Sequence, residues 1–281
     1  MSTSAPTIAA ETAGLIEAAE IAFITAQIEG ACQLFPGHGF RAERVGGGVA
    51  AITKPSFGRK LNHVAGFGMG SHVTEKDFEA LERICRGVGV PVEINICPFA
   101  HPSSAELLAA RGYRVCVEIS VYFLPLRDYD QPECLPTESR EEIRISPVSA
   151  EEHDLFLEAS VTGFQSAVNE PDLLHTLAGI ALRRPDTVLY FARIDGKIAG
   201  TAGVAFITTP QGRVAELYID STVPEFRGRG VQAALLRERL LEANKRGFEI
   251  ATVNTWPVGT SARNVERAGF QLAYRKDVYT I

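Results

Sequence analysis

A basic, glycine-rich segment, TVPEFRGRGVQAALL over residues 222–236, has the composition of a phosphate-binding loop. It follows an apolar run, Ala215–Ile219, that is typical of a β-strand, and it leads into a helical pattern of apolar residues. Backbone N–H groups at the start of a helix converge on one spot, and the helix dipole adds partial positive charge there. Glycines let the backbone approach an anion without an intervening Cβ. The spacing therefore predicts a site for a phosphorylated cofactor between a strand and a helix.

The loop fits neither of two common phosphate motifs. The chain contains no G-x-G-x-x-G dinucleotide fingerprint and no G-x-x-x-x-G-K-[ST] string. An ordinary solvated turn is the alternative to a phosphate site. The residues in question are Arg227, Gly228, Arg229, Gly230, Val231 and Gln232.

This string resembles the acetyl-CoA loop of the GNAT acyltransferase superfamily, [Q/R]-x-x-G-x-[G/A]. Arg227 and Gly230 match that pattern, whereas Gln232 replaces the usual small residue. The resemblance implies that these six residues hold acetyl-CoA, or another acyl-CoA, as a co-substrate.

The elements predicted after residue 142 follow the order of that family. They comprise a strand, two helices, a hairpin around the Asp195-Gly196 turn, the strand before the loop, a helix, a strand, a short helix and a last strand. Their ranges are Glu142–Val148, Ala150–Gly163, Asp172–Leu182, Val188–Ile194, Ile198–Ile207, Val214–Ile219, Val231–Arg246, Glu249–Asn254, Ser261–Ala268 and Phe270–Tyr279. Gly269 fits the left-handed residue that closes a helix. We expect an α+β fold, with a mixed central sheet flanked by helices.

Composition limits the class of protein. The 281 residues suffice for two domains, and a hydrophobic fraction of 46% supports sizeable cores. No apolar run is long enough to span a bilayer, the N-terminus does not read as a secretory signal, and a net charge of −6 argues against nucleic acid. Five cysteines without a C-x-x-C pair indicate buried thiols in the cytoplasm rather than disulfides or a zinc site. They are Cys32, Cys85, Cys97, Cys116 and Cys134.

The N-terminal half carries a second copy of the pattern. Aligning Gly112 with Gly269 (269 − 112 = 157) keeps apolar positions in register from a strand through a helix to the next strand; coincidence is the alternative. At this offset the basic loop falls on GSHVTEKDF, residues 70–78, which lacks arginine and carries Glu75 and Asp77. Carboxylates at a helix start would repel a pyrophosphate. The chain thus resembles tandem GNAT proteins, with a degenerate N-terminal copy that has lost cofactor binding.

These patterns divide the chain into three parts. We expect a degenerate GNAT-like domain over residues 1–126, a linker over 127–142 and a catalytic acyl-CoA-binding domain over 143–281. The linker contains Pro132, Pro136 and six acidic residues, and it shows little apolar periodicity.

The resemblance implies further contacts to the co-substrate. In the family, the strand before the loop has a bulge whose exposed backbone holds the pantetheine arm and the acyl carbonyl. This role falls on the backbone of Asp220, Ser221, Thr222 and Val223. Candidate side-chain contacts are Asn254, Ser261 and Asn264. Asn254 is alternatively a turn residue before Pro257.

Glu216 is the candidate general base. It lies eleven residues before Arg227, where some family members place a catalytic glutamate, and strand alternation puts it on one face with Tyr218. Desolvation on a half-buried strand next to the thioester would raise its pKa. The alternatives are a solvated charge on the strand or a partner for an arginine. Val265 replaces the family's usual tyrosine acid, so the thiolate leaves unassisted or another hydroxyl, such as that of Tyr218, protonates it.

Two functions of different classes follow. The first is an N-acyltransferase that transfers an acyl group from acyl-CoA, above all acetyl-CoA, to a primary amine of a small molecule or peptide within a ternary complex. The second is a non-catalytic acyl-CoA sensor or scaffold. Neither function requires a metal, nucleic acid or a membrane, and a homodimer is compatible with both. The early helices, which build the acceptor side in this family, carry no motif that identifies the amine.

Overall fold

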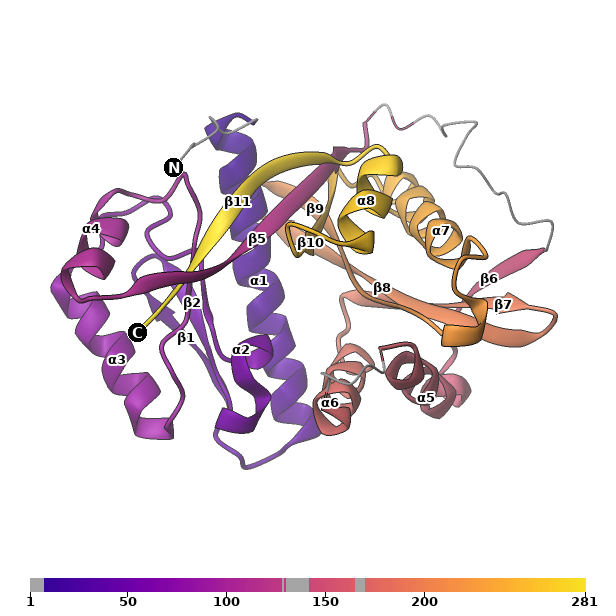
Figure 1. Cartoon of the computed structure of the whole chain (residues 1–281), viewed down its shortest axis with the longest axis horizontal. Helices are drawn as coiled ribbons and strands as arrows, with labels where there is room; N and C mark the ends of the chain where they lie inside the picture. Colours follow the sequence, from indigo (N-terminus) through magenta and orange to yellow (C-terminus); the bar gives the residue numbers. More distant parts are fainter. Residues whose placement is uncertain (1–7, 128, 130–141, 165–169) are drawn as a thin grey trace.

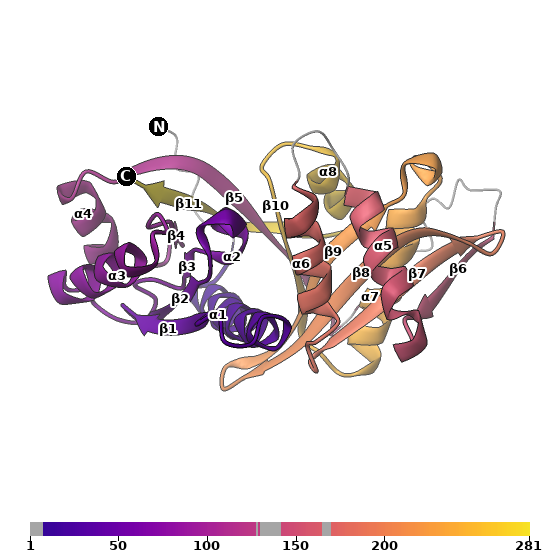
Figure 2. The same ribbon diagram turned by 90° about the horizontal axis from the view of Figure 1, so that it is seen from below.

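The computed structural model describes residues 8–127, 129, 142–164 and 170–281. Within them, eleven strands form one continuous sheet in the order β1-β2-β3-β4-β11-β5-β10-β9-β8-β7-β6, with helices on both sides (Figures 1 and 2). The strands are β1 (Arg41–Val45), β2 (Gly48–Ile52), β3 (Val64–Ala65), β4 (Ile94–Ile96), β5 (Arg114–Pro125), β6 (Ile143–Pro147), β7 (Thr187–Ile194), β8 (Lys197–Thr209), β9 (Gly212–Thr222), β10 (Ile250–Thr255) and β11 (Gln271–Thr280). The helices are α1 (Ala10–Leu34), α2 (Gly58–Leu61), α3 (Glu75–Val88), α4 (Ser103–Ala110), α5 (His153–Phe164), α6 (Pro171–Ala181), α7 (Val231–Lys245) and α8 (Thr260–Arg267).

The predicted α+β class and the predicted order of elements after residue 142 are confirmed. Element ends differ from the sequence ranges by a few residues at most. The β7–β8 hairpin turns at Asp195 (φ 50°) and Gly196 (φ 77°), the pair of left-handed residues that a two-residue type I′ turn requires.

The two halves repeat the same local structure at the offset of 157 residues. Helices α4 and α8 have equivalent bounds, and each is followed by a left-handed glycine, Gly112 (φ 81°) and Gly269 (φ 92°). In both, the glycine N–H and that of the next residue, Tyr113 or Phe270, bond back to carbonyls of the last helical turn. The repeat detected in the sequence is therefore real at the level of the backbone.

The final strands of the two halves are exchanged, which the sequence did not predict. β11 lies between β4 and β5, and β5 lies between β11 and β10 (Figure 2). In the antiparallel β5–β11 pair, Ile119 faces Lys276 (276 − 119 = 157), so the offset maps this pair onto itself. The two register shifts, one near each end of the pair, are related in the same way. The two halves therefore join in one sheet at the β5–β11 pair, and a local pseudo-two-fold axis relates these two strands.

Helix α1 joins the halves on one face of this sheet. It packs against β1 and β2 and also against β8, β9 and α6, and it crosses the middle of the molecule in Figure 1. Because neighbours cover it on several sides, its apolar residues are not confined to one stripe. In the described parts of the chain, no helix, α1 included, has the length and apolar character needed to cross a membrane. The proposed division at residues 126 and 143 stays a prediction, and linker residues 128 and 130–141 lie outside the described residues.

The cysteines only partly follow the expectation of buried thiols. Cys85 and Cys97 are buried and Cys32 is partly buried, but Cys116 is exposed. Cys116 is the extra residue at a register shift of β5, where a bulge breaks the alternation of side chains. These four thiols are free, and Cys134 lies outside the described residues.

Candidate functional site

Strands β9 and β10 diverge in the middle of the C-terminal half. They pair in parallel at only three positions, the last of which joins Glu216 to Thr252. Beyond it β10 continues along β5 to the pair Thr255–Ser120, whereas β9 continues along β8. We call this divergence the fork. It leaves the edge of β9 over residues 217–222 without a partner strand among the described residues, so backbone groups there are available to a ligand.

A bulge distorts β9 just beyond the fork, as the family resemblance implied for the strand before the loop. The β8–β9 register shifts between the pairs Thr201–Ser221 and Gly203–Tyr218. Ile219 lies in the bulge with φ 55°, a left-handed conformation that costs a β-branched residue about 1–3 kcal/mol. The bulge also brings Ile219 to the same face as Tyr218, against the alternation expected from the sequence. Strain that the surroundings hold in place is a common property of ligand sites.

The phosphate loop, residues 223–230, ends at a helix start that no side chain caps. A short 3₁₀ turn, Pro224–Phe226, is followed by Gly228 (φ 77°) and by Gly230 (φ 82°), the N-cap of α7. The first turn of α7 contains no acidic residue, and a Cβ on Gly228 would meet nothing within 4 Å. The first N–H groups of a helix have no intrahelical acceptor, and Val231 and Gln232 supply such groups here. The loop therefore offers an anion an open, positively polarised helix end.

Its two arginines are placed differently. Arg227 donates hydrogen bonds to the carbonyl oxygens of Thr222 (3.3 Å) and Gly163 (3.1 Å), so it ties the loop to the ends of β9 and α5. The guanidinium of Arg229 lies 4.9 Å from the ring centroid of Phe226. Both cations stay at the loop and add to the positive potential of the helix end.

The four residues predicted to hold the co-substrate through their backbone each form a hydrogen bond or an ion pair within the protein. The Ser221 hydroxyl is 2.8 Å from that of Thr201, and the N–H of Val223 donates to the carbonyl of Ala199 (3.0 Å). The Thr222 carbonyl accepts from Arg227. Asp220 is held through its side chain by Arg239.

Three predicted side-chain contacts lie around α8. The Asn264 side-chain amide donates to the side-chain oxygen of Gln232 (2.5 Å), which joins the first turn of α7 to the middle of α8. Asn254 is exposed on β10, and Ser261 is exposed in the first turn of α8. Val265, where the family's tyrosine would stand, is buried in the core. The structure thus brings Gln232 and Asn264 together but gives Asn254 and Ser261 no hydrogen bond to either.

Glu216 lies at the fork and is buried, with 7% of its surface exposed. Its carboxylate accepts a hydrogen bond from the Thr252 hydroxyl. Burial raises its pKa to about 7, and Glu20 adds to the rise, while the bond from Thr252 and the charges of Lys276 and Arg184 oppose it. A carboxyl with a pKa near neutrality is suited to general base catalysis. The alternative of a solvated charge on the strand is excluded by this burial.

Tyr218 lies on the same face of β9. Its hydroxyl is 2.8 Å from that of Thr187, and its ring meets the edge of Phe23 from α1, with 5.0 Å between ring centroids. Burial raises its pKa to about 12, so the phenol stays protonated at neutral pH. It can therefore donate a proton but cannot act as the base.

A buried ionic cluster beneath α1 was not predicted. Lys276 of β11 is fully buried and forms ion pairs with Glu17 (2.6 Å) and Glu20 of α1. The Tyr274 hydroxyl donates to Glu17 (2.6 Å), and burial raises the Glu17 pKa. A sequence signal existed, because Glu17 and Glu20 interrupt an apolar helix, but their partner lies more than 250 residues away. The cluster fastens α1 to the sheet and belongs to the electrostatic surroundings of Glu216.

The equivalent region of the N-terminal half is closed to an anion. Thr74 caps α3, and its N–H and hydroxyl donate to the Asp77 carboxylate at 2.8 and 2.7 Å. These bonds lower the Asp77 pKa. Arg111 pairs with Glu75 in the same turn at 2.5 Å. The helix end is therefore satisfied by its own side chains.

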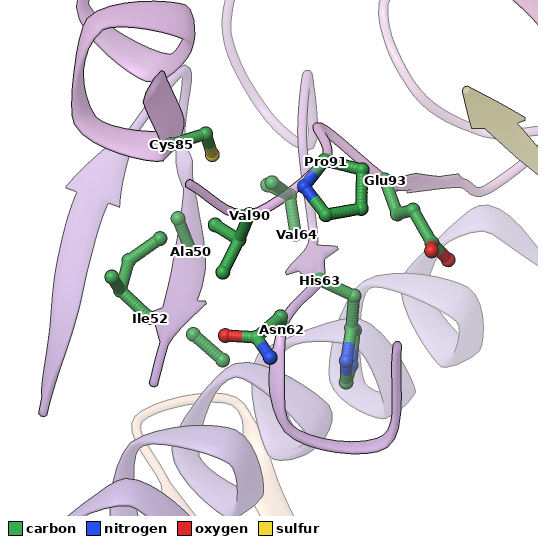
Figure 3. A pocket seen from close by; sticks show the side chains of 10 residues that line it. Ala50, Ile52, Asn62, His63, Val64, Cys85, Val90, Pro91 and Glu93 are labelled. Carbon is green, nitrogen blue, oxygen red and sulfur yellow. The ribbon is translucent and has the colours of Figure 1, made fainter. Parts of the chain in front are cut away.

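Two cavities of the N-terminal half differ in size and lining from a CoA site. Figure 3 shows a pocket between β2, β3 and the end of α3, whose volume of about 10 Å³ is no more than one water molecule needs. An open hollow of about 250 Å³ lies on the exposed, charged face of α3, away from the fork, and is lined by Glu79, Glu82, Arg83 and Arg86. Within the described residues, no group of three or more histidine, cysteine, aspartate or glutamate side chains is arranged to hold a metal ion.

Comparisons with known proteins agree with this fold. Residues 152–270 match the model of the acetyltransferase (GNAT) family. The structure is similar to a GCN5-related N-acetyltransferase from Kribbella flavida, with a TM-score of 0.62, 17% identity and coverage of 94% of this chain and 95% of that one. It is also similar to a tandem GNAT protein from the clavulanic acid biosynthesis pathway, with a TM-score of 0.61, 14% identity and coverage of 98% and 96%. No curated protein matches the chain. Residues 152–270 therefore match the GNAT acetyltransferase family, and the whole chain has the fold of a tandem GNAT protein.

Proposed function

We propose that this protein is an acyl-CoA-dependent N-acyltransferase that uses acetyl-CoA and acts on a primary amine of a small molecule or a peptide. The proposal rests on three features that occur together: the fork at Glu216, the bulge at Ile219 and the uncapped start of α7. They follow one another along a single strand–loop–helix unit, inside the segment that matches the GNAT family model.

The donor would lie along this unit. Its pyrophosphate would accept hydrogen bonds from N–H groups of the phosphate loop and the first turn of α7, where Gly228 and Gly230 keep the backbone accessible. Its pantetheine arm would enter the fork and pair with the free edge of β9. The thioester carbonyl would then reach the bulge, close to Glu216.

Glu216 would act as the base for the acceptor. The amine nitrogen attacks the thioester carbonyl carbon, its proton moves to the Glu216 carboxylate, and the carbon–sulfur bond breaks. The departing thiolate takes a proton from solvent or from a hydroxyl. Tyr218 is the candidate donor because its phenol is protonated and lies on the same face of β9. The free thiols of the described cysteines are compatible with the cytoplasm as the site of action.

A non-catalytic acyl-CoA sensor or scaffold is the second candidate. One observation favours it: the position of the family's tyrosine acid is occupied by a buried valine, Val265. Such a protein would bind acetyl-CoA through the same loop and release no thiol.

Two measurements on the full-length chain test the proposal. Titration calorimetry with acetyl-CoA should give one site per chain, because α7 starts without a capping side chain after a basic loop, whereas its counterpart α3 starts with a capping box. A chain that binds no acetyl-CoA contradicts both functions. Release of free thiol from acetyl-CoA should then rise when a reactive amine from a panel is added. Binding without thiol release across the whole panel favours the sensor.

A further inference from the structure

Arg239 lies inside the C-terminal core, on the face of α7 that packs against β8 and β9. None of its side-chain surface is exposed. Its guanidinium forms a bidentate ion pair with Asp220, with N–O distances of 2.5 and 2.7 Å. It also donates to the carbonyl oxygens of Gly203 (2.9 Å) and Leu235 (3.0 Å). A charge buried this deeply needs an ionic partner and hydrogen bonds, and Arg239 has both: these contacts engage four of its five N–H groups.

These contacts coincide with the bulge. Gly203 and Asp220 belong to the two strands at the point where the β8–β9 register shifts, and Asp220 follows the left-handed Ile219. A bulge disrupts the local ladder of hydrogen bonds. The guanidinium bridges the two strands there, with one contact to the backbone of β8 and two to the side chain of Asp220 on β9.

We propose that Arg239 is a positioning residue for the acyl group. Through Asp220 it holds the bulged backbone of β9 in the orientation that binds the thioester carbonyl. This inference rests on the proposed function, because it assumes that the donor's carbonyl lies at the bulge. Arg239 touches neither the donor nor the acceptor.

Only an arginine can make this set of contacts. Its planar guanidinium presents several N–H groups in fixed directions, whereas a lysine ammonium is a single point of charge on a flexible stem. Arg239→Lys keeps the buried charge near Asp220 but loses the simultaneous bond to Gly203. The bulge would then relax, while the phosphate loop and the start of α7 would stay as they are.

The test compares three ligands that share the same nucleotide: CoA, acetyl-CoA and S-ethyl-CoA, a thioether without the carbonyl. A hydrogen bond to the carbonyl should make the wild-type chain bind acetyl-CoA roughly 5-fold more tightly than S-ethyl-CoA. In Arg239→Lys this preference should fall below about 2-fold, with CoA affinity unchanged within about 2-fold. Arg246→Lys at the C-cap of the same helix is the control, because Arg246 is half-exposed and contacts Glu242 and the Phe206 ring rather than Asp220; it should keep the preference.

Each other outcome has a definite meaning. Retention of the preference by a folded Arg239→Lys chain overturns the inference, and so does an equal loss of affinity for all three ligands, which marks a purely structural residue. A wild-type chain that binds acetyl-CoA and S-ethyl-CoA equally overturns it while leaving CoA binding intact, whereas a wild-type chain that binds none of them removes the proposed function itself. If Arg239→Lys does not fold, Asp220→Asn is measured in the same way, since it keeps the shape of the partner and removes its charge.

Discussion

Helices α7 and α3 both follow a strand and a glycine-containing loop at equivalent places in the two halves, but their first turns differ in capping and in charge. α7 begins at a left-handed glycine with two arginines before it and no acidic residue in its first turn. α3 begins at Thr74, which forms a capping box with Asp77, and Glu75 lies in the same turn. A fold can thus be repeated with an open, positively polarised helix start in one copy and a helix start occupied by carboxylates in the other.

The strands beside these helices differ as well. β9 has eleven residues, diverges from β10 at Glu216 and carries the bulge. β3 has two residues and pairs with β4 at a single position, Val64–Ile94. The N-terminal half therefore lacks, among its described residues, a long strand edge along which a pantetheine arm could lie. Its contribution is instead α1 and β5, which complete the surroundings of Glu216 and the sheet next to β10.

The largest expected effect concerns the fork. Glu216→Gln keeps the shape of the side chain and removes the base, so turnover of a reactive amine should fall about 10²- to 10⁴-fold with little change in the KM for acetyl-CoA. Because the free amine becomes more abundant as pH rises, the mutant should recover at alkaline pH. A deficit that is equal at every pH would assign Glu216 to packing instead.

The same variant gives a second, independent readout in stability. The Glu216 pKa is about 7 in the folded chain against 4.5 ordinarily, so the carboxyl stabilises the fold below pH 4.5 and loses that contribution as pH rises through 7. At pH 8 Glu216→Gln should therefore be more stable than wild type by up to about 3 kcal/mol, and the gain should vanish in acid. Denaturant unfolding at both pH values measures the difference.

The next effect concerns the open helix start. Gly230→Asp places a carboxylate where the pyrophosphate would lie, and repulsion of several kcal/mol should weaken CoA binding about 100- to 1,000-fold. Gly230→Asn has nearly the same shape and backbone strain without the charge, so it should lose much less. Equal losses in the two variants would attribute the effect to strain, and unchanged CoA affinity in a folded Gly230→Asp chain would place the phosphates elsewhere.

A smaller effect is expected at Arg227. Its guanidinium is engaged with the carbonyls of Thr222 and Gly163, and backbone N–H groups should supply most contacts to the phosphates. Arg227→Ala should therefore weaken CoA binding by only about 3- to 10-fold, with a reduced dependence on salt. Arg111→Ala, which removes the arginine beside α3, should leave CoA affinity unchanged; a loss there would mean that both halves take part in binding.

The smallest effect is expected at the capped helix. Thr74→Ala removes the capping box of α3, which should cost about 1 kcal/mol of stability and lower the Tm by about 2–4 °C. CoA binding should be unaffected and should stay at one site per chain. The appearance of a second site after the cap is removed would show that capping alone, rather than the loss of a loop and a fork, distinguishes the two halves.

Some features were determined by the sequence alone because they depend on neighbours along the chain. The Asp195-Gly196 turn, the glycines that close α4 and α8, and the glycine at the start of α7 each reflect a local backbone requirement. The offset between Gly112 and Gly269 revealed the repeat, and the spacing of Glu216 from Arg227 selected the carboxyl that lies at the fork. Arg239 could also have been found, since it follows Leu235 and Leu236 on the apolar stripe of α7.

Only the tertiary structure decided which strand pairs with which. Backbone hydrogen bonds between strands are the same for every sequence, so the alternating pattern of β11 fits β10 as well as β5, and the exchange of β5 and β11 left no local trace. The same holds for the pairing of Lys276 with Glu17 and Glu20, which depends on α1 crossing the sheet. The pKa of Glu216 is a further consequence, because burial sets it and burial depends on elements from both ends of the chain.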